Sequence, residues 1–135
     1  FRPAPGIVRH QCGTQPILSL AALDAALDVW DDVAPQDVRA KATALVATFI
    51  HLVEERCGRS GIAVAGPRGA APRGAHVALA HPDGYAVVQA LAAAGVEGDF
   101  RAPDLMRFGL APLWTRFVDV WNAVDVLARI LDTRA

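Results

Sequence analysis

Lysine is almost absent from this chain: among 135 residues there is one, Lys41, and the other twelve basic residues are arginines. Schiff-base chemistry requires a lysine amine, so Lys41 is the only residue here that could carry it. An excess of charge of one sign is also missing, because 13 basic residues face 14 acidic ones. The chain therefore lacks the net field that attracts nucleic acid or an anionic membrane, and we expect neither as a partner.

Long hydrophobic runs and cysteines are scarce as well. The longest apolar stretches, 42–50 and 86–96, fall well short of the roughly 18 residues that a membrane span needs. Cys12 and Cys57 are too few for a disulfide framework, which favours reduced thiols and a cytoplasmic location. The chain begins with Phe1 and carries no secretory leader, so we interpret its start as the cut end of a longer protein.

Apolar residues, by contrast, are plentiful. They make up 53% of the chain against 20% charged residues, and the mean hydropathy is +0.29. The length is typical of one folded domain, and the composition argues against disorder. Because a small soluble domain needs fewer apolar residues, part of the surface is expected to meet another surface.

The spacing of the apolar residues predicts four helices and three strands. Residues 1–15, with their prolines and glycines, are interpreted as an extended leading segment, and 58–74 as a mobile surface loop. Helices are expected from Pro16 to about residue 30, over 35–57, over 85–94, and from Thr115, taken as an N-cap, onward. Strands are expected over 75–80, 96–101 and 105–110.

This order of elements predicts an α+β fold, in which helices cover one face of a small and mostly antiparallel sheet. The last two strands are too close in sequence for a crossover helix, so they are expected to pair as a hairpin. The predicted organisation is the leading segment 1–15 followed by one domain over 16–135.

Arg107 is the first candidate binding residue. On a strand over 105–110, Met106, Phe108 and Leu110 share one face, and Arg107 lies on the other face beside Gly109. A guanidinium next to a glycine can receive a planar carboxylate through two parallel hydrogen bonds. Alternatively, Asp99, Asp104 or a backbone carbonyl satisfies Arg107, and the spacing alone favours this second interpretation.

Gly13 and Thr14 form the second candidate, because they precede the first predicted helix. A helix N-terminus with a threonine can receive an anion such as phosphate. Thr14 can equally be a plain capping residue, which is the commoner role.

Other chemistry finds little support in the sequence. The residues with metal-ligating side chains match no zinc spacing: His10, Cys12, His51 and Cys57. His76 and His81 flank a predicted strand, where a solvated or backbone-bonded imidazole is the expected role. No catalytic triad spacing is present. We therefore expect neither a catalytic residue nor a metal site within this chain.

Two sequence runs resemble the C-terminal region of bacterial kynureninase. They are GVEGDFRAPDLMRFGLAPLWTRFVDVW over 95–121 and IVRHQCGTQPIL over 7–18. The resemblance spans essentially the whole chain and implies the small domain of a fold-type I enzyme dependent on pyridoxal 5'-phosphate. This family hydrolyses L-kynurenine to anthranilate and L-alanine, a step of tryptophan catabolism in the kynurenine pathway that also serves NAD biosynthesis.

The resemblance also implies roles for single residues. Arg107 stands at the arginine that binds the α-carboxylate of the small-molecule substrate. Gly13 and Thr14 are similar to the pair that reaches the cofactor phosphate of the neighbouring subunit, which implies a homodimer. Arg101 has no implied role, and an ion pair with Asp99 or Asp104 is expected for it.

Two positions depart from the family pattern. The catalytic lysine of the family lies in its N-terminal large domain, and Lys41 does not match it. The resemblance therefore implies that the large domain is a partner and that this chain alone is inactive. Trp114 stands where the family has tyrosine, which affects the expected contacts near the carboxylate site.

Two alternatives remain open from the sequence. One is the small domain of a related enzyme such as a cysteine desulfurase-like lyase, which needs a catalytic cysteine on a flexible loop; Cys57 at a helix end fits this poorly. The other is a non-catalytic α+β interaction module, which would show no exposed apolar face that promotes association.

Overall fold

The computed structural model of the chain describes residues 2–11, 13–69 and 73–133. The chain forms two compact units, Phe1–Ala34 and Pro35–Ala135, and each is described by itself. The sheet and the candidate residue Arg107 belong to the second unit.

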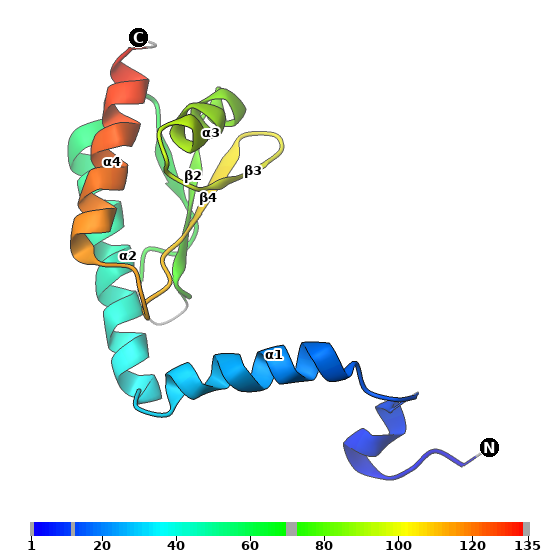
Figure 1. Cartoon of the computed structure of the whole chain (residues 1–135). Coiled ribbons are helices and arrows are strands. Elements are labelled where there is room, and N and C mark those ends of the chain that lie inside the picture. The colour runs from blue at the N-terminus through cyan, green and yellow to red at the C-terminus, as the bar shows by residue number, and fades with distance from the viewer. Residues whose placement is uncertain (1, 12, 70–72, 134–135) are drawn as a thin grey trace. The chain divides into compact units, whose positions relative to one another are not determined.

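The first unit contains a 3-10 helix η1 (Gly6–His10), the helix α1 (Ile17–Leu27) and a 3-10 turn η2 (Asp28–Trp30) (Figure 1). The leading segment is thus not extended throughout, because η1 interrupts it where Gly6 adopts a φ of +65°. Helix α1 begins directly after Pro16, as predicted.

Helix α1 is apolar on all sides, since its only charged residue is Asp24. None of its side chains is buried within the described unit, and Leu18 is 87% exposed. A helix that is apolar all round normally lies in a buried environment. The exposed large apolar residues of this unit come from η1, α1 and η2 and are together called the apolar α1 surface: Ile7, Val8, Ile17, Leu18, Leu20, Leu23, Leu27, Val29 and Trp30.

The second unit opens with the long helix α2 (Pro35–Cys57), whose bounds match the prediction. Its buried residues recur at helical spacing and face the core of the unit: Ala42, Leu45, Val46, Phe49, Ile50, Leu52, Val53 and Cys57. Such a stripe is the signature of a helix that packs one face on a core.

The sheet has four antiparallel strands in the order β1-β2-β4-β3, with bounds β1 (Ala63–Ala65), β2 (His76–Ala80), β3 (Asp99–Arg101) and β4 (Leu105–Gly109). Strand β1 was missed, because it lies within 58–74, where the glycines and prolines favoured a loop. Pairing with β2 supplies its backbone hydrogen bonds, which local composition does not encode. Strand β3 is shorter than the predicted 96–101.

Two further helices complete the unit, α3 (Gly84–Ala93) and α4 (Phe117–Asp132). The N-cap of α4 is Arg116, so the prediction of Thr115 is wrong. The Arg116 backbone N–H donates to Asp119 Oδ2 at 2.8 Å, and this contact from the first turn fixes where the helix begins. Hydrogen bonds from Arg116 lower the pKa of Asp119 to about 2.

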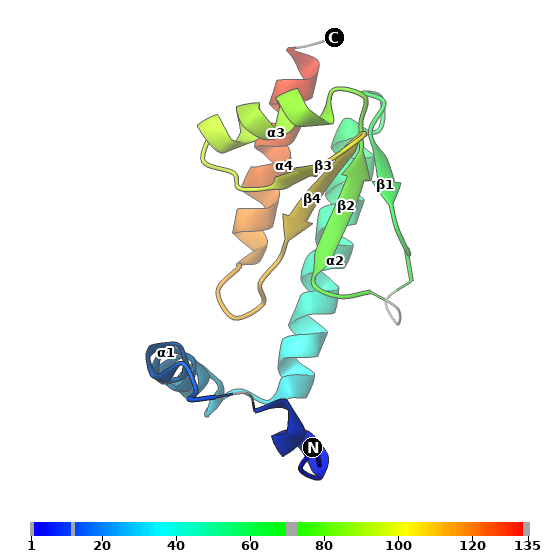
Figure 2. The ribbon, with the colours of Figure 1, turned by 90° about the vertical axis from the view of Figure 1, so that its right-hand side faces the viewer.

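The two faces of the sheet differ in what covers them. Val77, Leu79, Met106 and Phe108 point to one face and are buried under α2, α3 and α4. Figure 2 shows the sheet in front of α2 and α4, with its other face uncovered in this unit. This open sheet face includes Arg107 and combines alanines and a glycine with larger and charged side chains: Ala63, Ala65, His76, Ala78, Ala80, Asp99, Arg101, Leu105, Arg107 and Gly109. The predicted α+β fold with helices on one face is thereby confirmed.

Truncating the centre of the core tests this layering. Leu79→Ala should lower the free energy of unfolding by about 2–5 kcal/mol, because Leu79 is fully buried and its removal leaves a cavity under α2. Val118→Ala, at a half-exposed position on α4, should change it by less than about 0.5 kcal/mol. Urea unfolding followed by circular dichroism measures both, and equal effects would contradict the assignment of the core.

Candidate functional site

Arg107 lies at the middle of β4 on the open sheet face, as the alternation of residues predicted. Its cross-strand partners are Ala78 on β2 and Asp99 on β3. Along β4, Gly109 leaves open space beside it, since no described atom lies within 4 Å of where a Cβ at Gly109 would stand. With such small neighbours the Arg107 side chain remains 40% exposed.

Asp99 binds Arg107 through two parallel hydrogen bonds. The Arg107 Nε–H donates to Asp99 Oδ1 at 2.7 Å, and Nη2–H donates to Oδ2 at 2.5 Å. Arg101 donates from Nη2 to the same Oδ2 at 3.3 Å. The expectation that Asp99 satisfies Arg107 is confirmed, and so is the ion pair expected for Arg101.

The pair with Asp99 leaves part of the guanidinium available. An arginine has five N–H donors, and Asp99 uses one on Nε and one on Nη2. Within the described residues, no hydrogen bond engages Nη1. The Nη1/Nη2 edge can therefore receive a second carboxylate in the same two-pronged geometry. Binding to Asp99 and binding to a ligand are compatible.

A shallow hollow of about 510 Å³ adjoins Arg107 on the open sheet face. Its lining comes from β2, β4, the first residue of β3 and the two residues before it: His76, Glu97, Gly98, Asp99, Arg107 and Gly109. The sequence did not assign His76 or Glu97 to this place. His76 arrives through its register with Gly109, which becomes visible only once β2 is known to pair with β4.

In the hollow, Asp99 and Arg107 each stabilise the charged form of the other. Hydrogen bonding from Arg107 is the main reason that the pKa of Asp99 lies below its ordinary value, with the charges of Arg107 and Arg101 adding to it. The same hydrogen bond raises the pKa of Arg107. Both groups are therefore charged at neutral pH, and a ligand meets a permanently cationic edge.

Gly13 and Thr14 lie in the first unit and are exposed. Helix α1 has Pro16 at its N-cap and no side-chain cap hydrogen bond. The capping role for Thr14 is therefore wrong, because the helix begins three residues after it. The space around the Cα of Gly13 is open, with no described atom within 4 Å of an added Cβ. The role of this pair in binding a phosphate stays a prediction.

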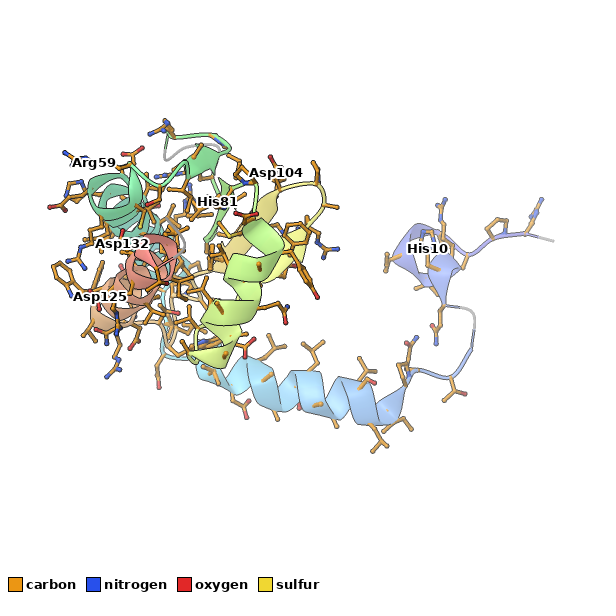
Figure 3. All side chains as sticks on the ribbon, turned by 90° about the horizontal axis from the view of Figure 1, so that it is seen from above. His10, Arg59, His81, Asp104, Asp125 and Asp132 are labelled. Atoms are coloured by element: carbon orange, nitrogen blue, oxygen red, sulfur yellow. The ribbon has the colours of Figure 1, made fainter. Side chains whose placement is uncertain are left out.

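The imidazole of His81, which is labelled in Figure 3, is hydrogen-bonded to backbone groups. Its Nδ1 accepts the Asp83 backbone N–H at 3.1 Å, so Nε2 carries the proton and donates to the Ser60 carbonyl at 3.0 Å. This confirms the backbone-bonded imidazole expected from the sequence. His76 is exposed beside the hollow.

The remaining candidates for metal or covalent chemistry are separated or shielded. Cys57 is buried, and burial raises the pKa of its thiol to about 11, so the reactive thiolate is scarce. Lys41 is partly buried within α2. In the part of the chain that the structure describes, no three acidic, histidine or cysteine side chains gather to hold a metal ion. Cys12 lies outside the described residues.

Comparison with known proteins places the second unit in a family. A family model described as "Kynureninase C-terminal domain" matches residues 38–127. The chain is 48% identical to a kynureninase of Pseudomonas fluorescens over 134 residues, which cover 99% of the chain and 32% of that relative. Kynureninases of Burkholderia mallei (strain SAVP1) and Burkholderia pseudomallei (strain K96243) are also 48% identical, over the whole chain and 32% of their own length. The chain thus spans about a third of the length of these relatives. No helix in the described residues is long and apolar enough to span a membrane.

The charge pairing in the hollow can be tested by titration. In Arg107→Met the pKa of Asp99 should rise toward the ordinary value of about 3.9, since the variant removes the two-pronged donor. In Arg101→Met the rise should be smaller, because this contact is longer and single. Carboxyl-carbon NMR across a pH series measures both.

The lowered pKa of Asp99 also determines how the stability of the fold depends on pH. The contribution of the ion pair is present above the ordinary carboxyl pKa and is lost as the pH falls through the lowered value. A larger rise in the Asp99 pKa for Arg101→Met than for Arg107→Met would contradict the geometry.

Proposed function

Since the chain belongs to the kynureninase family as a C-terminal portion, we propose that it completes the substrate site of an enzyme that hydrolyses L-kynurenine to anthranilate and L-alanine. In this proposal residues 1–15 form a leading segment and 16–135 the small domain. The N-terminal large domain of the same enzyme is the partner. The reaction belongs to tryptophan catabolism in the kynurenine pathway, which also serves NAD biosynthesis.

The Nη1/Nη2 edge of Arg107 is the observation that carries this proposal. The substrate is an amino acid, and its α-carboxylate matches the two-pronged geometry of this edge. Because Arg107 lies on a paired strand and Asp99 holds its other edge, the position of a bound carboxylate is fixed relative to the sheet. Fixing that group orients the bonds at the α-carbon, which contributes to the rate by positioning.

Gly13 and Thr14 fit a pyridoxal 5'-phosphate that is held mainly by the large domain. Both residues are exposed, and a hydroxyl with neighbouring backbone N–H groups can donate to a phosphate. Lys41, partly buried in α2, is a poor candidate for the covalent attachment, so the large domain supplies that lysine. When bound, the cofactor supplies an electron sink for charge developing on the substrate.

Two features support the proposed assembly. The described residues of its own unit leave the apolar α1 surface uncovered, which favours contact with a large domain and with a second subunit in a homodimer. The described cysteine, Cys57, is free and buried, which fits a reducing compartment and supports a cytoplasmic location. Its shielded thiol also disfavours a cysteine desulfurase-like reaction.

Removing the guanidinium tests the substrate role. The test uses the joined enzyme, in which this chain follows the N-terminal part of the Pseudomonas fluorescens kynureninase. Arg107→Met should raise KM for L-kynurenine about a hundredfold and lower kcat as well, because the carboxylate loses a two-pronged charged partner. The control Arg59→Met removes an exposed arginine outside the hollow and should leave both constants unchanged. Near-normal KM and kcat in Arg107→Met would refute the role.

Exposure of the apolar α1 surface tests the proposed partner. The isolated chain should bind the dye ANS, self-associate in sedimentation, and fail to turn over L-kynurenine. Leu18→Ser and Leu23→Ser together should reduce dye binding, because they interrupt the apolar α1 surface. The joined enzyme should bind little dye. A monodisperse chain without dye binding would instead favour the non-catalytic interaction module.

A further inference from the structure

The contacts of Arg107 determine the direction of its remaining N–H donors as well as its charge. A guanidinium is planar and rigid, so fixing two of its nitrogens fixes the direction of the remaining donors. Asp99 binds Nε and Nη2 at 2.7 and 2.5 Å and thereby orients the Nη1/Nη2 edge. Without this carboxylate, the long and flexible arginine side chain would have many rotamers open to it on the exposed face.

Asp99 is itself restrained from two sides. It is the cross-strand partner of Arg107, so the ladder of β3 and β4 sets the separation of the two backbones. Arg101, two residues further along β3, points to the same face and donates to Asp99 Oδ2 at 3.3 Å. The three side chains form the Arg101–Asp99–Arg107 row, in which two cations flank one anion. The row keeps one net positive charge, which attracts a carboxylate.

We propose that Asp99 is a positioning residue that aims Arg107 at the substrate carboxylate, and that Arg101 holds Asp99 in place for this purpose. This inference rests on the proposed function, because it takes the substrate carboxylate to be the ligand of Arg107. The lowered pKa of Asp99 agrees with it, since the carboxylate stays ionised throughout the neutral range.

The alternative is that the row only ties β3 to β4. The Arg107 and Asp99 side chains are 40% and 48% exposed, and ion pairs at such positions add little stability. A positioning role and a structural role therefore predict different results. Positioning affects the recognition of a carboxylate, whereas a structural tie affects only the melting temperature.

Asp99→Asn in the joined enzyme separates the two roles. Asparagine keeps the shape and one acceptor oxygen, but its NH2 group opposes one of the two Arg107 donors and the charge is lost. KM for L-kynurenine should rise about tenfold, with a smaller change in kcat and an unchanged melting temperature. Asp99→Glu keeps the charge and should recover part of the loss, and Arg101→Met should raise KM by about twofold to threefold.

A binding measurement gives a readout independent of turnover. Calorimetry compares L-alanine, which carries the carboxylate, with L-alaninamide, which does not. In the joined enzyme, the ratio of the affinity for L-alanine to that for L-alaninamide should fall about tenfold in Asp99→Asn. The reason is that the variant no longer orients Arg107 toward a carboxylate. The matched control is Asp125→Asn, which removes an ion-paired carboxylate on α4 outside the hollow and should keep the preference.

The double variant distinguishes failure of this inference from failure of the proposed function. If Asp99 acts through Arg107, Asp99→Asn should have no further effect in an Arg107→Met background. A large effect of Arg107→Met with less than a twofold effect of Asp99→Asn on KM and on the L-alanine preference would overturn the positioning role alone. No effect of Arg107→Met would overturn the proposed function itself.

Discussion

The register between β3 and β4 places a carboxylate directly across from a guanidinium, and the candidate site depends on that pairing. Because side chains alternate along a strand, a slip of one residue would turn Arg107 toward the core and bring Met106 to the open face. On the opposite face Phe100, which packs against the core, pairs with the buried Met106 and holds this register. The same strand register therefore determines both the packing of the core and the position of Arg107 at the site.

Some surfaces of the chain are covered by helices and others are not, and this difference bears on its high apolar fraction. Three helices bury one face of the sheet, while no described residue of the same unit covers the open sheet face or the apolar α1 surface. A chain that makes up about a third of its relatives' length is expected to keep such surfaces for the rest of the protein. The high apolar fraction noted in the sequence agrees with the contacts proposed for a large domain and a second subunit.

The errors made from the sequence have two different physical origins. Strand β1 gains its stability from pairing with β2, whereas its glycine-rich flanks suggested a loop. Thr115 and Thr14 are good capping residues by type, but Asp119 fixes the start of α4, and α1 starts only after Pro16. A distant strand therefore decided the first error, whereas neighbouring residues, Asp119 and Pro16, decided where the two helices begin.

The sequence by itself determined the two faces of β4, the bounds of α2 and the family resemblance, because these depend on periodicity and residue type within one segment. It also named Asp99 among the partners open to Arg107. Only the tertiary structure decided that Asp99 takes one edge of the guanidinium and leaves the other available, and that His76 joins the hollow. Those facts depend on which strands pair and in which register, and strand pairing is a property of the whole fold rather than of a local sequence.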